Sequence, residues 1–167
     1  MHARDRGGRS PATMRALLQR VRRAAVRVVG DRSPDGEIVG QIGQGLVVLL
    51  GVRGEDTPDD ARGLAARTAH LRIFDDDAGR LNRSILDVGG EVLSVPQFTL
   101  YAETRGGRRP SFAQAAPPEE AEPLYREFNR ALEALGLRVA PGRFQTHMVV
   151  EIHNDGPVTL LLDSRER

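Results

Sequence analysis

The chain has 167 residues, with 24 basic and 23 acidic side chains and a formal net charge of +1. It contains neither Cys nor Lys, which excludes disulfides, thiolate nucleophiles, Schiff bases, a pyridoxal cofactor and a Walker-type phosphate loop. Because the net charge is so small, any contact with nucleic acid has to come from local clusters of Arg. The length and the hydrophobic content of 40% predict one soluble, cytoplasmic domain, without a membrane span or a signal peptide.

The N-terminal segment differs from the rest of the chain. Residues 1–13, MHARDRGGRSPAT, are polar, rich in Arg and Gly, and show no hydrophobic period. We interpret residues 1–13 as a disordered extension or as the product of a misplaced start, with Met14 as the alternative beginning. Residues 14–167 are then interpreted as a single domain.

Strand patterns fill the first third of this domain. Residues 16–21 and 25–29 each predict a strand, and the turn residues 31–36 lead to a return strand over residues 37–42. Residues 45–52 are a continuous apolar run bounded by Gly, which is typical of a central strand buried on both faces. Three or four strands are therefore expected before any helix.

Two helices are indicated by their first residues. Thr57 is suited to cap the first helix, Pro58 to occupy its first position, and Asp60 to complete a capping box. The sequence Pro117-Pro118-Glu119-Glu120 begins a second helix, which Gly136 is placed to end. Its apolar face is expected to comprise Ala121, Leu124, Tyr125, Phe128, Leu132 and Leu135.

The remaining strands are predicted around these helices. Residues 91–95 read as a strand that continues past Pro96 to Tyr101. Two further strands, over residues 148–152 and 158–163, are expected on either side of the turn Asn154-Asp155-Gly156-Pro157.

Familiar catalytic constellations and metal sites are missing from the sequence. There is no Gly-x-Ser-x-Gly elbow and no His-Glu-x-x-His helix, and the four His residues are scattered. The acidic run from Asp75 to Gly79 resembles the start of a calcium loop, but Leu86 stands where a bidentate Glu is needed, so a turn is favoured. The sequence thus predicts neither a metal nor a cofactor.

One short segment offers groups suited to an ester. Gln97-Phe98-Thr99 provides a carboxamide, a hydroxyl and adjacent backbone N–H groups, which together can bind a carbonyl and stabilise its oxyanion. The alternative is an ordinary strand in which Thr99 pairs across the sheet. The residues alone leave both interpretations open.

Two loops complete the set of candidates. TRGGRRPSF places Arg105, Arg108 and Arg109 among Gly residues, which suits phosphate binding but also fits a plain exposed basic loop. In the segment NDGPVT, the Gly156-Pro157 bond is a candidate for the cis form, which about 5–6% of X–Pro bonds adopt in folded proteins.

Taken together, QRVRRAAV, VPQFTLYAETRGGRRPSF and NDGPVT, in this order and with these separations, strongly resemble the D-aminoacyl-tRNA deacylases. The resemblance extends from Met14 to about Ser164. It implies an α/β fold, a single domain with a mostly antiparallel, barrel-like curved sheet and two main helices. It also implies a cytoplasmic homodimer that removes D-amino acids, or glycine mischarged on tRNA-Ala, from tRNA in translation proofreading.

The resemblance assigns roles to residues of this chain. Gly156 and Pro157 match a Gly-cis-Pro motif that reaches from one subunit into the pocket of the other and rejects L-aminoacyl-tRNA, and Arg20 matches the Arg that supports this motif. The catalytic segment Gln97, Phe98 and Thr99 is expected to line the pocket and to supply backbone donors.

In the family, the 2′-hydroxyl of the tRNA is thought to activate water, so Thr99 is not expected to be the nucleophile. The candidates for tRNA binding are Arg105, Arg108 and Arg109.

Two departures from the family pattern bear on specificity. Pro96 stands where the family usually has Ser, and a related animal deacylase branch that corrects L-alanyl-tRNA carries Pro-Gln-x-Thr. Gln145 and His147 replace residues that are usually small or acidic, at the expected rim of the pocket. Because NDGPVT matches the D-specific form, we favour a D-aminoacyl-tRNA deacylase; the alternatives are an editing deacylase for L-alanyl-tRNA and a non-catalytic tRNA-binding module.

Overall fold

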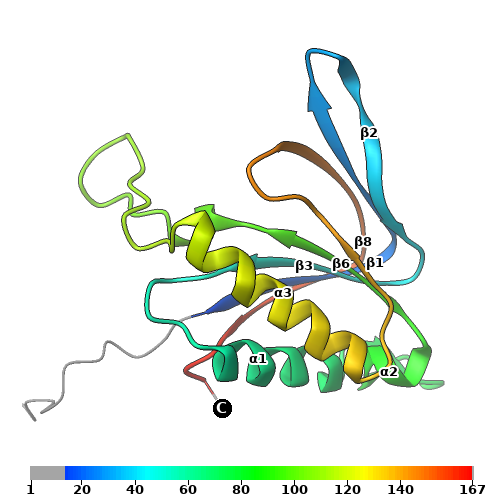
Figure 1. Cartoon of the computed structure of the whole chain (residues 1–167). Helices are drawn as coiled ribbons and strands as arrows, with labels where there is room; N and C mark the ends of the chain where they lie inside the picture. Colours follow the sequence, from blue (N-terminus) through cyan, green and yellow to red (C-terminus); the bar gives the residue numbers. More distant parts are fainter. Residues whose placement is uncertain (1–13, 167) are drawn as a thin grey trace, which may run out of the picture.

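A computed structural model describes residues 14–166, so the expected disordered extension, residues 1–13, lies outside the described residues. Its strands and helices form an α/β arrangement in which α1 and α3 lie together over one face of a large curved sheet (Figure 1). In chain order the elements are β1 (Arg15–Gly30), β2 (Ser33–Ile42), β3 (Gly45–Gly51), α1 (Pro58–His70), β4 (Phe74–Asp75), β5 (Leu81–Arg83), α2 (Ile85–Val88), β6 (Glu91–Pro96), the 3-10 helix η1 (Phe98–Tyr101), α3 (Pro118–Ala134), β7 (Val139–Pro141) and β8 (His147–Asp163).

The long strand β1 organises the sheet. It pairs antiparallel with β8 along one edge, and with β3 and then β2 along the other. The sheet continues from β3 through parallel pairs to β6 and β7. At the other end of the sheet, β2 lies close to β7: a Cβ added to Gly40 of β2 would lie 3.3 Å from the Cβ of Ala140 in β7. The sheet is therefore curled like a barrel, as the resemblance implied.

Two pairs of predicted strands are single strands in the structure. The predicted break before residue 25 falls at Arg22 and Arg23, which are exposed side chains in the middle of β1. The predicted turn at residues 154–157 is a bulge inside β8: Gln19 of β1 pairs with Thr159, whereas Val21 pairs with Asn154. The sequence predicts a turn between two strands here, but β8 pairs with the uninterrupted β1 on both sides of these residues, so the extra residues form a bulge instead.

The prediction that the strand over residues 91–95 continues past Pro96 is also wrong. β6 ends at Pro96, and the next residues form η1. The Gln97 N–H donates to the Leu50 carbonyl at 2.8 Å, and the Leu100 N–H then bonds back to the Gln97 carbonyl at 3.3 Å. Because Pro96 has no N–H to donate and Gln97 departs from extended backbone, with φ −142° and ψ 80°, the ladder stops here.

The helices begin where the sequence predicts. Thr57 and Asp60 form the expected capping box of α1, and Pro118 opens α3. The chain turns after α3 at Gly136, whose φ of +102° favours glycine. Leu135, which was expected on the buried face of α3, is 39% exposed. The short elements α2, β4, β5 and β7 were not predicted.

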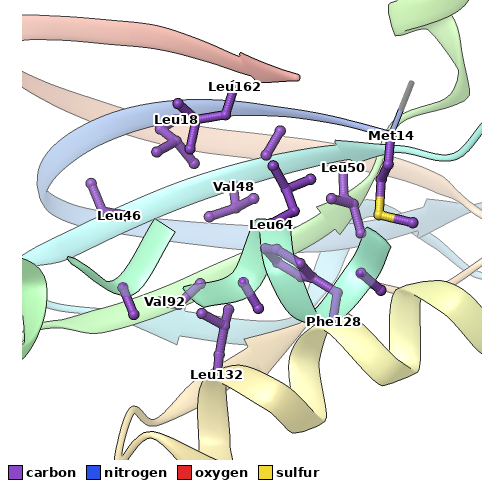
Figure 2. Close-up of a cluster of buried hydrophobic side chains, with 14 of the residues drawn as sticks. Met14, Leu18, Leu46, Val48, Leu50, Leu64, Val92, Phe128, Leu132 and Leu162 are labelled. Atoms are coloured by element: carbon purple, nitrogen blue, oxygen red, sulfur yellow. The ribbon is translucent and has the colours of Figure 1, made fainter. Parts of the chain in front are cut away.

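Two hydrophobic clusters hold these layers together. Figure 2 shows the larger cluster, in which Phe128 of α3 and Leu64 of α1 lie against Leu18 and Val48 of the sheet. All four are at most 1% exposed, and burial of each such side chain stabilises the fold by roughly 1.5–3 kcal/mol.

The second cluster fills the inside of the curled sheet. It comprises Val21, Ala24, Val26, Ile42, Val47, Leu93, Val95 and Ala140. Because β3 contributes to both clusters, it is buried on both faces, as its apolar run predicted. Within residues 14–166, no helix has the length and apolar character needed to span a membrane.

Candidate active site

A cavity of about 410 Å³ opens where β3 and β6 end beside the N-terminal end of α3. One wall consists of Pro96, Gln97 and Phe98, and a second wall is the loop from Arg143 to Thr146 with Met148. The floor and sides are contributed by Leu50, Val52, Phe112, Ala115, Ala116, Pro118 and Ala121. The site is therefore a largely apolar pocket bounded by short backbone segments.

Backbone donors begin η1 next to the first wall. The N–H groups of Phe98 and Thr99 open η1, where a helix has no internal acceptor for its first N–H groups. In the described part of the chain, neither N–H donates to a protein acceptor. The side chain of Phe98 is 58% exposed and packs edge-on against Phe112, with 5.1 Å between ring centroids. A backbone N–H of a residue that lines an apolar pocket, as Phe98 does, is the kind of donor that can bind a developing oxyanion, and the N–H of Thr99 is its neighbour.

The Thr99 hydroxyl is occupied by a neighbour. The Gln97 side-chain amide donates a hydrogen bond to its oxygen. Thr99 does not line the cavity, in contrast to Gln97 and Phe98. Among the described residues, the Thr99 hydroxyl therefore has no hydrogen-bonded base, and it lies outside the pocket lining.

The lining of the pocket holds few ionisable groups. Among the described lining residues, Arg143 is the one charged side chain, and no carboxylate or imidazole is present. Within residues 14–166, no three His, Asp or Glu side chains converge as a metal site would require. The described pocket thus offers donors and shape rather than a side-chain base.

The Arg-rich loop stands next to this pocket. Its two ends are tied by reciprocal backbone hydrogen bonds between Glu103 and Ser111, of 2.7 and 2.9 Å, and the loop projects from the body of the molecule (Figure 1). Arg105, Arg108 and Arg109 are all exposed, and the Arg105 guanidinium lies 3.7 Å from the Glu103 carboxylate. The loop therefore places a cationic surface close to the pocket in the chain, since Arg109 precedes Phe112 by three residues.

The remaining predicted residues lie together elsewhere. Arg20 is only 7% exposed, and its guanidinium donates to the Asp155 carbonyl at 3.0 Å, the Ile73 carbonyl at 3.1 Å and the Asp75 carboxylate at 3.2 Å. The peptide bond between Gly156 and Pro157 is cis.

The conformation of Gly156 depends on its lack of a side chain. Its φ is +129°, and an added Cβ would lie 3.1 Å from the Arg20 Nη2 atom and 2.8 Å from Val158 Cγ2. Arg20 thus fixes one end of an exposed Gly-Pro segment that only glycine fits.

Comparison with known proteins identifies the family. Residues 17–163 match the family model described as D-Tyr-tRNA(Tyr) deacylase. The chain belongs to this family. It is 58% identical over 150 residues to a D-aminoacyl-tRNA deacylase of Deinococcus deserti, which covers 90% of this chain and 99% of that protein. It is also 60% identical over 153 residues to a D-aminoacyl-tRNA deacylase of Desulforudis audaxviator, covering 92% of this chain and 99% of that protein.

Two solved structures are similar to this chain in fold. The c-Myc DNA unwinding element binding protein is 38% identical, with a TM-score of 0.79, covering 89% of this chain and 97% of that one. A probable eukaryotic D-amino acid tRNA deacylase is 19% identical, with a TM-score of 0.76 over 90% of this chain and 99% of that one, which shows a shared fold.

In this deacylase the predicted site residues form two groups. Gln97 and Phe98 line the pocket, whereas Arg20, Gly156 and Pro157 are not among its lining residues. Sequence reasoning missed Phe112 and Met148 as pocket residues, and it noticed the loop around Gln145 only as a departure from the family. Their signal was weak, because single apolar residues in loops have no period to mark which cavity they face.

Proposed function

We propose that this chain hydrolyses the ester bond of D-aminoacyl-tRNA in the pocket lined by Gln97 and Phe98. At the site, the proposal is carried by the unpaired N–H groups of Phe98 and Thr99 beside a pocket whose described lining has no carboxylate or imidazole. Membership of the deacylase family and relatives 58–60% identical support the same reaction. Its substrate, charged tRNA, places the protein in the cytoplasm.

The reaction needs little from the side chains of the protein. Water attacks the ester carbonyl carbon, the carbonyl oxygen takes up negative charge, and the ester C–O bond breaks to release the amino acid and the tRNA hydroxyl. The N–H groups of Phe98 and Thr99 stabilise that oxyanion. The 2′-hydroxyl of the terminal ribose activates the water, which fits a pocket without its own base. A tRNA ending in 2′-deoxyadenosine should then be cleaved far more slowly than normal tRNA.

The chirality of the substrate is selected by Gly156 and Pro157 of a second subunit. These residues are exposed and lie outside the pocket of their own chain. Within residues 14–166, β8 pairs with β1 alone, and its Val149 and Leu161 side chains are 45% and 50% exposed. An unpaired edge with exposed apolar side chains suits contact with a second copy.

The substrate assay separates this function from its rivals. Purified protein should release D-Tyr from D-Tyr-tRNA and leave L-Tyr-tRNA intact, and it should also deacylate glycyl-tRNA formed on tRNA-Ala. Cleavage of L-Ala-tRNA alone would instead assign the L-alanyl editing activity, which is the alternative that Pro96 suggests through the Pro-Gln-x-Thr pattern. Salt-sensitive tRNA binding without hydrolysis of any ester would assign a non-catalytic binding module.

A mixing experiment tests the shared site. Phe98→Pro removes a pocket donor, and Gly156→Ala disturbs the Gly-Pro segment. If each site combines both subunits, random mixed dimers of two inactive variants recover about a quarter of the wild-type activity, because half are heterodimers with one intact site. No recovery, with both variants folded and dimeric, would contradict a site shared between subunits.

The Arg-rich loop binds the phosphates of the tRNA. Replacing Arg105, Arg108 and Arg109 with Ala should weaken tRNA binding and reduce the slope of log affinity against log salt by about 0.7 to 0.9 per lost contact. The matched control replaces Arg62, Arg126 and Arg130, which are at least half exposed on the helices. Equal losses of tRNA affinity in both triple variants would show that the loop acts only through the net charge of the protein.

A further inference from the structure

A buried tyrosine links the two walls of the pocket. Tyr125 of α3 is 4% exposed, and its hydroxyl donates to the Ser94 carbonyl at 2.6 Å. The same hydroxyl accepts a hydrogen bond from the Gly142 N–H at 3.1 Å. Ser94 lies on β6, two residues before the wall formed by Pro96, Gln97 and Phe98, whereas Gly142 immediately precedes the loop that forms the second wall.

The ring of Tyr125 reaches the second wall directly. It packs edge-on against Phe144, with 5.2 Å between ring centroids, and Phe144 lines the pocket. Burial raises the pKa of the Tyr125 hydroxyl, so the group stays protonated and remains a donor at neutral pH.

The two walls approach closely at Gly142. Its N–H also donates to the Ser94 carbonyl, at 2.8 Å. An added Cβ would lie 3.1 Å from Met148 Sδ and 3.3 Å from Pro96 Cδ, which are pocket residues of the second and the first wall. Pro96 itself has no N–H, so the end of β6 depends on the bonds at Ser94 and on the Gln97 N–H to hold its place.

We propose that Tyr125 is a positioning residue for deacylation, whose hydroxyl sets the spacing between the Pro96–Phe98 wall and the Gly142–Thr146 wall. The inference rests on the proposed function. The residue touches no reacting group, and it acts by holding the Phe98 and Thr99 N–H groups at a fixed distance from a substrate bound against the second wall. Loss of such positioning affects the transition state more than the bound ground state.

The test is Tyr125→Phe, which keeps the ring against Phe144 and removes the hydroxyl. With D-Tyr-tRNA we expect kcat to fall about three- to tenfold, the scale of one neutral hydrogen bond, while KM changes less than twofold. The matched control is Thr68→Val, which removes another buried hydroxyl-to-carbonyl hydrogen bond, of 2.8 Å, inside α1 and away from the pocket. This control should lower stability and leave kcat unchanged.

A second variant approaches the same spacing from the other side. Gly142→Ala should press Met148 and Pro96 apart by a few tenths of an ångström and should also lower kcat. The two changes should be non-additive, because both act on one contact between the walls.

The outcomes separate this inference from the function on which it rests. A wild-type protein that cleaves no D-aminoacyl-tRNA would overturn the proposed function. An active wild type with unchanged kcat in folded Tyr125→Phe would overturn the positioning role alone, as would equal losses in Thr68→Val and Tyr125→Phe.

Discussion

The segment Gln97-Phe98-Thr99 and the segment Gly156-Pro157 are held in place by opposite means. The first is fixed by backbone bonds at its flanks and leaves the N–H groups of Phe98 and Thr99 without a protein acceptor in the described residues. The second is tied down by the buried guanidinium of Arg20. A site that stabilises charge needs free donors, whereas a site that selects by shape needs a rigid backbone. We infer that catalysis and selectivity in this deacylase can be damaged separately.

The largest expected effect concerns the donors of the first segment. Phe98→Pro removes one N–H at the first position of η1, where proline is tolerated. We expect kcat with D-Tyr-tRNA to fall by about 100-fold or more, as for loss of an oxyanion donor in other enzymes. Phe98→Ala is the control, because it removes the ring and keeps the N–H. Similar losses in both variants would assign the effect to the ring.

Arg20→Lys tests the second segment. A lysine keeps the positive charge near Asp75, but a single amine has no planar fork with which to bond both the Asp155 and Ile73 carbonyls. We expect about a tenfold loss in kcat/KM for D-Tyr-tRNA, with measurable cleavage of L-Tyr-tRNA. Arg22→Lys is the control, because the Arg22 side chain also pairs with Asp155 but is 82% exposed. If Arg20→Lys cleaves D-Tyr-tRNA and L-Tyr-tRNA with the selectivity of the wild type, Arg20 does not contribute to chiral discrimination.

Thr99→Val probes whether the hydroxyl of the first segment matters. Its oxygen already accepts from the Gln97 amide and lies outside the pocket lining, while its N–H survives the change. We expect kcat to stay within about threefold of the wild type, since only one exposed hydrogen bond is lost. A loss of several hundredfold in single-turnover assays would restore the hydroxyl as a reacting group.

The smallest effect is expected outside both segments, at Glu91. Hydrogen bonding from the Gly43 N–H, aided by Arg138, lowers the pKa of Glu91 below its ordinary value of 4.5. A lowered folded-state pKa means that the ionised form stabilises the fold above pH 4.5, and that this contribution is lost as the pH falls through the folded-state pKa. Denaturant unfolding of Glu91→Gln should therefore differ from the wild type most at neutral pH and least in acid, with kcat unchanged. A difference that grows in acid would reverse this assignment.

Much of the fold could be predicted from local chemistry. The capping box of Thr57 and Asp60 and the apolar run of β3 are each read from neighbouring residues, and the structure confirms both. The predictions failed where a partner strand decides the outcome. The bulge at residues 154–157 follows the path of β1, and β6 ends at Pro96 because the chain leaves extended backbone at Gln97 and turns into η1.

The sequence by itself determined the family, and it predicted the residues of both candidate segments, because motifs such as VPQFTLYAETRGGRRPSF and NDGPVT are contiguous. It also excluded thiolate and amine chemistry through its missing Cys and Lys. Only the tertiary structure decided that Phe98 and Phe144 face one cavity, that Tyr125 joins its walls, and that Arg20 meets Asp155. These contacts join residues far apart in the chain, so they depend on strand register and helix packing, which no local pattern encodes.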